Sequence, residues 1–313
     1  MTGLICRRSS ENSATRARVW YGDAARVFSR DLLRRTMTSL RVVPIAIALV
    51  ALSGCASARL ALPRGPGTPL PGFAPIFETA VAHCRSIRTV EAMIRLRGRG
   101  GGANLNGRVR AGLAAPASLR LEGLAPFGAP GFYFVARPGE ALLWLTREGR
   151  VLTDVSPAAV LESLTGVSLG PSDLRAVLTG CLAPDPEPIG GRRYGDWVVV
   201  DLRGGAVAYL RPDEGEHRLV AGTRDGLTIE YDDFRRRLPW QVRVISAAVE
   251  PGTGRPLTDL TVSLSQVNLN VELVEAVFSI EVPPDVLPMT LRDLRLAGPL
   301  EATRDAQSSI KPR

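Results

Sequence analysis

Residues 89–111 read TVEAMIRLRGRGGGANLNGRVRA, and this stretch decides the fold class. Apolar and polar residues alternate over residues 90–97 and again over residues 105–111, which is the period of a strand with one buried face. The glycine-rich residues 98–102 between the two halves predict a hairpin turn. The sequence therefore predicts two antiparallel strands here.

More stretches of the same kind follow, separated by glycine- and proline-containing turns. The expected strands cover residues 118–123, 131–136, 141–146, 150–155, 197–202, 206–211, 217–221, 227–231, 241–249, 257–268 and 276–281. About a dozen short strands at this spacing indicate an antiparallel, mainly β protein with inserted helices.

Three helices interrupt the strand pattern. Residues 73–88 place apolar side chains three and four positions apart, as an amphipathic helix does. Two short helices are expected between Ser156 and Gly166 and between Pro171 and Gly180, because Ser and Pro favour helix starts and Gly favours helix ends. Their apolar positions are Val160, Leu161, Leu164, Leu174, Val177 and Leu178.

The N-terminal region carries a targeting pattern. Arg41 precedes a short apolar run over residues 42–52, which is too short to span a bilayer but suits a secretory signal. The run ends in Leu-Ser-Gly-Cys at residues 52–55, which resembles the lipobox of bacterial lipoproteins, where the Cys is acylated and becomes the mature N-terminus. We therefore expect residues 1–54 to be a leader that includes a signal peptide over 37–54, with Cys55 lipidated.

The first 36 residues are polar and Arg-rich and do not fit a signal peptide. Either translation starts at Met37, or Arg34-Arg35 belongs to a twin-arginine signal. Residues 55–72 combine the lipidated Cys with a Pro- and Gly-rich segment that predicts an extended tether. Ala56 stands where Asp marks inner-membrane retention in Gram-negative lipoproteins, so the resemblance implies the outer membrane, facing the periplasm.

Composition excludes several classes of function. Residues 1–54 contain nine Arg and three acidic residues, so most of the net charge of +8 lies in the leader and no nucleic-acid partner is expected. Two histidines and no C-x-x-C motif argue against a metal site. Gly166-Val-Ser168-Leu-Gly170 matches the hydrolase pattern G-x-S-x-G, but a helix is expected before it. An esterase using Ser168 is thus a remote alternative, and we expect no enzyme, catalytic residue or cofactor.

The segment 117–182 is similar to the LolB-like lipoproteins of the LolA/LolB lipoprotein-localisation superfamily. The similarity lies in SLRLEGLAPFG at residues 118–128, RVLTD at 150–154, and LTGVSLGPSDLRAVLTG at 164–180. It implies a mainly β (α+β) fold over residues 73–297. That fold is an incomplete antiparallel β-barrel of about 11–12 strands with an N-terminal helix and two short plug helices. Residues 298–313 form a polar tail.

The same resemblance implies a function. The cavity of such a barrel accepts lipoprotein acyl chains from a periplasmic LolA-like carrier, and the monomeric protein inserts the cargo into the outer membrane without breaking a bond. A loop of Pro126, Phe127 and Gly128 would engage the membrane lipids, with Phe127 in place of the usual Leu. Because the body is longer around 203–260, a structural or assembly lipoprotein that shares only the fold is the alternative.

Two cysteines remain in the body after Cys55 is lipidated, namely Cys84 and Cys181. Disulfides persist in oxidising compartments such as the periplasm. A bridge between them would tie the first helix to the second plug helix. Two separate buried thiols are the other possibility.

Replacing Cys55 tests the anchor. Thioether formation needs sulfur, so Cys55→Ser is expected to leave an uncleaved precursor without acyl chains. Metabolic labelling with palmitate measures this. Label that persists in the Ser variant would show that Cys55 is not the lipidation site.

Overall fold

The computed structural model describes residues 59–125 and 129–297. The chain divides into two units, Met1–Arg59 and Leu60–Arg313, and every helix and strand of the described ranges lies in the second. No helix within these ranges is long and apolar enough to cross a bilayer.

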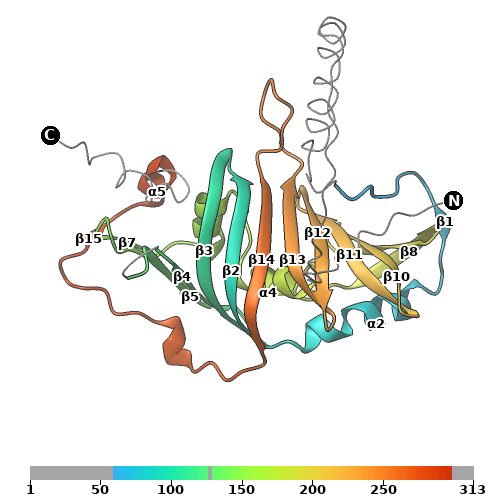
Figure 1. The fold of residues 1–313 in the computed structure, drawn as a ribbon, viewed down its shortest axis with the longest axis horizontal. Coiled ribbons are helices and arrows are strands. Elements are labelled where there is room, and N and C mark those ends of the chain that lie inside the picture. Colours follow the sequence, from blue (N-terminus) through green and yellow to red (C-terminus); the bar gives the residue numbers. More distant parts are fainter. Residues whose placement is uncertain (1–58, 126–128, 298–313) are drawn as a thin grey trace, which may run out of the picture. The chain divides into compact units, whose positions relative to one another are not determined.

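One sheet of 15 strands dominates this unit (Figure 1). The strands are β1 Thr68–Pro69, β2 Thr89–Gly100, β3 Ala103–Ala114, β4 Ser118–Gly123, β5 Phe132–Arg137, β6 Glu140–Leu145, β7 Arg150–Thr153, β8 Pro188–Tyr194, β9 Trp197–Leu202, β10 Val207–Asp213, β11 Glu216–Arg224, β12 Leu227–Arg235, β13 Leu238–Ser246, β14 Asp259–Leu269 and β15 Leu287–Pro288. They lie in the order β1-β8-β9-β10-β11-β12-β13-β14-β2-β3-β4-β5-β6-β7-β15. All neighbours are antiparallel except β7 and β15, and the two edges, β1 and β15, do not pair with each other. The expected incomplete β-barrel is confirmed.

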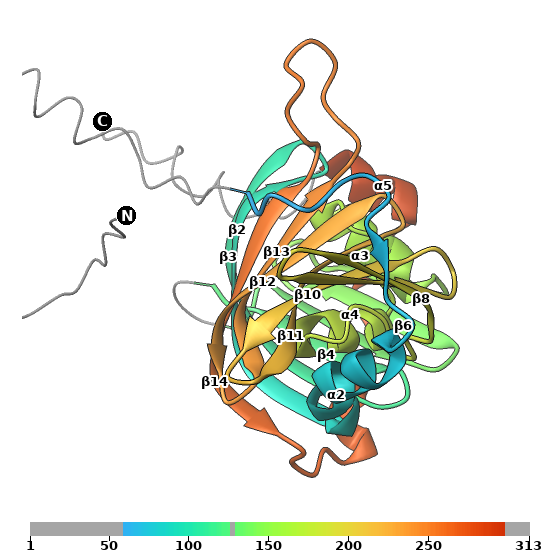
Figure 2. The same cartoon turned by 90° about the vertical axis from the view of Figure 1, so that its right-hand side faces the viewer.

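The helices are α2 Phe73–Ser86, α3 Pro157–Thr165, α4 Pro171–Thr179 and α5 Leu291–Ala297, with a 3-10 turn η1 at Glu275–Phe278. The two plug helices begin at proline and end at glycine in the left-handed region, as their sequences predict. Figure 2 shows the sheet curving around α3 and α4, with α2 at one end of the same side. We call this helix-bearing side of the sheet the inner face and the opposite side the outer face.

Strand alternation divides the side chains between these two faces. On β4 and β5 the buried residues Leu119, Leu121 and Phe134 point inward, whereas Arg120 and Tyr133 point outward. The inward side chains of nearly all the long strands join the buried apolar side chains of α2, α3 and α4 in one hydrophobic cluster. The core therefore lies between the inner face and the helices.

The strand count differs from the expected 11–12 in two ways. The segment that ends the Pro-rich loop forms β8, which pairs with β9, and the two-residue strands β1 and β15 extend the edges. By contrast, residues 276–281 form no strand. There the Arg120 guanidinium donates hydrogen bonds to the carbonyls of Val277 and Ser279, at 2.9 and 3.2 Å, so a side chain rather than a neighbouring strand satisfies the backbone.

The described part of the expected tether, residues 59–72, is bound to the body. Thr68 pairs with Arg193 of β8, and the N–H of Leu60 donates a hydrogen bond of 2.9 Å to the Glu230 carboxylate on β12. Because Glu230 alternates with the buried residues Ile229 and Tyr231, it lies on the outer face. The tether therefore meets the body on the outer face.

Replacing neighbouring residues of β5 tests the assignment of faces. Phe134 is 0% exposed, so Phe134→Ala is expected to lower the free energy of unfolding by about 3–5 kcal/mol. Tyr133→Ala is the matched control, because Tyr133 stacks on Trp144 at the outer face, where the pair is worth only about 0.5–1.5 kcal/mol beyond its burial. Chemical denaturation measures both variants, and equal losses would contradict the alternation.

Candidate functional site

The two plug helices fill the inner face. Helix α3 contacts β6 and α5, and helix α4 contacts β3, β4 and β13. Of the six apolar positions expected to face inward, Val160, Leu161, Leu164, Val177 and Leu178 are buried, and Leu174 is partly buried against the same cluster. The structure therefore brings all six residues together over the sheet.

Cys84 and Cys181 form a disulfide in the structure. Their sulfur atoms are 2.00 Å apart and their Cα atoms 5.6 Å apart. Cys84 lies in the last turn of α2, and Cys181 follows Gly180 at the end of α4. The bridge therefore fixes the C-terminal end of the plug to the N-terminal helix, 97 residues earlier in the chain.

Two arginine contacts hold α4 in place. The guanidinium of Arg224 on β11 lies 2.8 Å from the Asp173 carboxylate in the first turn of α4. The guanidinium of Arg175 donates a hydrogen bond of 2.7 Å to the carbonyl of Ile87. Burial lowers the pKa of Arg175 from its usual value, and the nearby positive charge of Arg88 acts in the same direction.

The residues after α4 are held by a buried tyrosine. The N–H of Leu182 donates to the Tyr231 hydroxyl at 3.1 Å, and Arg224 donates to the Leu182 carbonyl at the same distance. Burial raises the pKa of Tyr231 well above its usual range, so the hydroxyl stays neutral. This end of the plug therefore combines a disulfide with several polar contacts.

The connection between the two plug helices docks on the turn between β2 and β3. The Thr258 hydroxyl donates to the Gly166 carbonyl at 3.2 Å and accepts from the Gly101 N–H at 3.3 Å. Gly166 has φ +72°, and a Cβ there would lie 2.0 Å from the Gly101 nitrogen. Only glycine permits this approach. Thr258, which is 1% exposed, was not expected from the sequence because its two partners are distant along the chain.

The G-x-S-x-G segment is this same connection. Residues 166–170 join the end of α3 to the start of α4, and Ser168 is exposed. A nucleophile elbow needs a strand before the serine and a helix after it. The segment therefore lacks the geometry of a hydrolase site.

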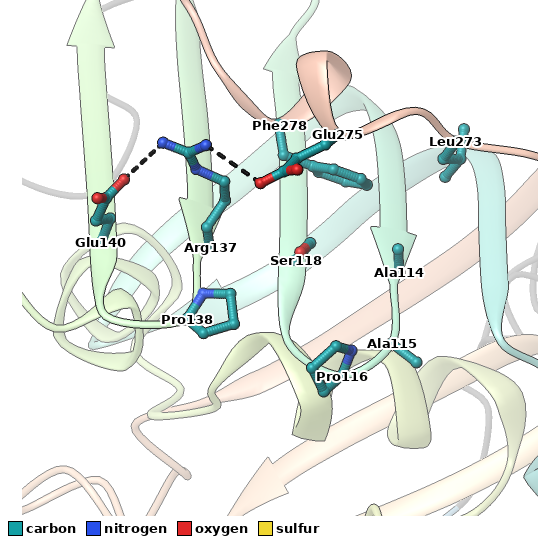
Figure 3. Close-up of a pocket in the computed structure, with 10 residues that line it drawn as sticks. All are labelled: Ala114, Ala115, Pro116, Ser118, Arg137, Pro138, Glu140, Leu273, Glu275 and Phe278. Atoms are coloured by element: carbon teal, nitrogen blue, oxygen red, sulfur yellow. Dashed lines mark hydrogen bonds and ion pairs between the residues drawn. The ribbon is translucent and has the colours of Figure 1, made fainter.

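Two pockets lie near η1, and no residue of α3 or α4 lines either of them. The larger, about 490 Å³, is bounded by the β3–β4 turn, the β5–β6 turn and the η1 segment. Figure 3 shows Arg137 between Glu140 and Glu275, at 2.7 and 3.6 Å, with Phe278 beside them. The second pocket, of about 250 Å³, shares Phe278 and is lined by Val135 and other residues of β5 and β6. No pattern in the sequence indicated either pocket.

Cys55 and the expected membrane loop of Pro126, Phe127 and Gly128 lie outside the described residues. The base of that loop is described. The N–H of Leu124 donates to the Arg108 carbonyl and the N–H of Gly131 to the Gly123 carbonyl, both at 2.8 Å. The loop therefore leaves the sheet beside β3, at the level of Arg108.

No protein-family model matches the chain, and no curated protein matches it. Solved structures with a similar fold include a LolA superfamily protein from Nitrosomonas europaea, with 12% identity, 66% of this chain and 98% of that chain covered, and a TM-score of 0.43. A DUF1329 family protein from Desulfovibrio piger has 13% identity, coverages of 66% and 96%, and a TM-score of 0.44. A putative outer membrane lipoprotein-sorting protein domain from Vibrio parahaemolyticus has 12% identity, coverages of 65% and 94%, and a TM-score of 0.41. These likenesses assign no ligand or partner to this chain.

Replacing Gly166 tests how the plug is docked. Gly166→Ala is expected to destabilise the protein, because an L-residue in the left-handed region costs about 1 kcal/mol or more and the new Cβ meets backbone. Gly195→Ala is the matched control, since Gly195 also has a positive φ, +56°, but a Cβ there would meet no atom within 4 Å. Thermal unfolding should show an excess loss of about 1–3 kcal/mol in the Gly166 variant. Equal losses would mean that the plug does not press on the β2–β3 turn.

Proposed function

We propose that this protein is a lipid-anchored cell-envelope lipoprotein whose inner face receives the acyl chains of other lipoproteins when the plug of α3 and α4 moves aside. The observation that carries the proposal is the composition of the plug. Two helices of nine residues each, too short to be stable alone, bury their apolar side chains against the sheet. An acyl chain offers the same kind of surface and can replace them.

The expected free energies suit a site that exchanges acyl chains rather than one that stores them tightly. Each buried CH₂ is worth about 0.8 kcal/mol, so an acyl chain gains a large free energy on entering an apolar site. Displacing the plug exposes buried leucine and valine side chains, and this exposure offsets much of that gain. A site of this kind binds cargo weakly enough to release it again, as a protein that hands cargo to a membrane must.

The contacts of the plug suggest how it opens. The disulfide and the Leu182 hydrogen bonds fix the C-terminal end of α4. The α3–α4 connection at Gly166 is held by noncovalent contacts, namely close packing, the Thr258 hydroxyl and the ion pair of Arg224 with Asp173 in the first turn of α4. The plug would therefore pivot about Cys181 and lift at Gly166. Opening of this kind needs no reduction of the disulfide.

The cellular role extends this proposal. Cys55 carries the lipid anchor in the outer membrane, facing the periplasm, and a LolA-like carrier supplies the lipoproteins. Phe127 enters the lipid with its neighbours Pro126 and Gly128 during release. Transfer makes and breaks no covalent bond, so the proposal requires no catalytic residue or cofactor.

A second candidate is a structural or assembly lipoprotein that keeps the plug closed. The observation that favours it is the disulfide between Cys84 and Cys181, which restrains one end of the plug. In this role the apolar inner face would be a permanent core and would bind no cargo.

Native mass spectrometry with added palmitate separates the two candidates. The test uses the full chain carrying Cys55→Ser, so that no covalent acyl chain interferes. We expect palmitate adducts on the oxidised protein and a lower apparent Kd in Gly166→Ala, because loosening the closed state raises the fraction that can bind. Gly195→Ala should bind like the parent.

The contrary outcome is equally clear. If no variant takes up palmitate, the closed structural role is correct. If only a Cys84→Ser/Cys181→Ser variant binds, the inner face accepts acyl chains but the proposed pivot at Cys181 is wrong.

A further inference from the structure

Three arginines stand close together on the outer face of β2 and β3. Arg95, Arg97 and Arg108 are exposed, and they alternate along their strands with buried residues such as Ile94 and Val109. Arg95 and Arg108 are direct cross-strand partners. Arg97 is two residues from Arg95 on the same face. We call these three residues the arginine patch.

No carboxylate of the described residues forms an ion pair with the arginine patch. In the described ranges its neighbours Arg99 and Arg110 pair with carboxylates, of Glu250 at 3.5 Å and Glu122 at 3.7 Å. Like charges directly opposite each other destabilise a sheet. A bound anion would remove this repulsion.

The tether contacts the outer face in the same cross-strand row as Arg97 of the patch. Leu60 is bound to Glu230, and cross-strand pairing connects Glu230 to Arg243, Arg243 to Thr261, and Thr261 to Arg97. Three strand spacings separate Glu230 from Arg97, which is about 14 Å. The attachment point of the tether and the arginine patch therefore share one row of the outer face.

Chain length then limits how far the anchor can be from the patch. Five residues lead from Cys55 to Leu60, and a fully extended chain of that length spans about 18 Å at most. A lipid on Cys55 therefore keeps the outer face close to the membrane surface. The phosphates of membrane lipids are the anions that the patch would meet first.

We propose that the arginine patch binds the phosphate groups of anionic membrane lipids and so holds the outer face of the sheet against the membrane. The inference rests on the proposed anchor at Cys55 for its choice of partner. Guanidinium groups suit this role because they bind phosphate oxygens through two parallel hydrogen bonds. At the base of the 124–131 loop, the N–H of Leu124 donates a hydrogen bond to the Arg108 carbonyl, so this loop starts beside the patch. The helix-bearing inner face then points away from the membrane, toward an arriving carrier.

Vesicle cosedimentation tests the proposal in the full chain carrying Cys55→Ser, where no acyl anchor contributes. The test variant is Arg95→Gln/Arg97→Gln/Arg108→Gln. The matched control is Arg193→Gln/Arg236→Gln/Arg292→Gln, which removes the same charge from exposed arginines elsewhere in the described structure. Thermal unfolding confirms that both remain folded.

With vesicles that contain phosphatidylglycerol, we expect the test variant to lose at least about tenfold in partition coefficient and the control to change little. Added salt should abolish the difference, because the contact is electrostatic. Vesicles of phosphatidylcholine alone should not distinguish the variants.

Equal binding of test and control variants to the anionic vesicles would overturn the proposal. So would a patch-dependent binding to polyglutamate without binding to vesicles, which would assign the patch to an acidic protein. Neither result depends on acylation of Cys55 or on palmitate uptake, so failure here is distinguishable from failure of the proposed function.

Discussion

The apolar inner face of the curved sheet must be kept from water, and most features of the described structure follow from this constraint. The sheet is open, so a second layer has to cover the inner face. The chain supplies that layer mainly from α2, α3 and α4, and α5 adds the buried Leu294. Helices α3 and α4 come from one insertion between β7 and β8. Burial of Val160, Leu164 and Val177 stabilises both the sheet and helices that are too short to form alone. The proposed function treats this cover as an element that an acyl chain can replace.

Two attachment points of that cover, at Cys181 and at Gly166, differ in chemistry. At the Cys181 end a covalent bridge to α2 and hydrogen bonds to buried Tyr231 make movement costly. At Gly166, between α3 and α4, the contacts are noncovalent: a close backbone approach, the hydroxyl of Thr258 and the Arg224–Asp173 ion pair in the first turn of α4. This asymmetry gives the proposed opening a direction. It also makes the proposed opening compatible with a disulfide-bonded plug.

Local pattern predicted much of this fold, and its failures have physical causes. The alternation of apolar and polar residues in β2 to β6 could be recognised in the sequence because it involves only residues close along the chain. The same is true of the helix boundaries, which proline and glycine mark. Strand β8 was missed because Pro188, Gly190 and Gly191 disfavour strands, and only its pairing with β9 makes them one. Residues 276–281 had the composition of a strand, but Arg120 binds their carbonyls instead. The hydrogen bonds from Thr258 to Gly166 and from Leu60 to Glu230 are also long-range, at 92 and 170 residues of separation. No local signal in the sequence marks them.

The central claim is that acyl chains occupy the inner face in place of the plug. A photoactivatable palmitate analogue, crosslinked to the full chain carrying Cys55→Ser and mapped by peptide mass spectrometry, tests it directly. The account predicts label on inward residues such as Leu119, Phe134 and Leu143, together with the apolar side of α3 and α4. Label confined to the pocket beside Phe278, with none on the inner face, would contradict it.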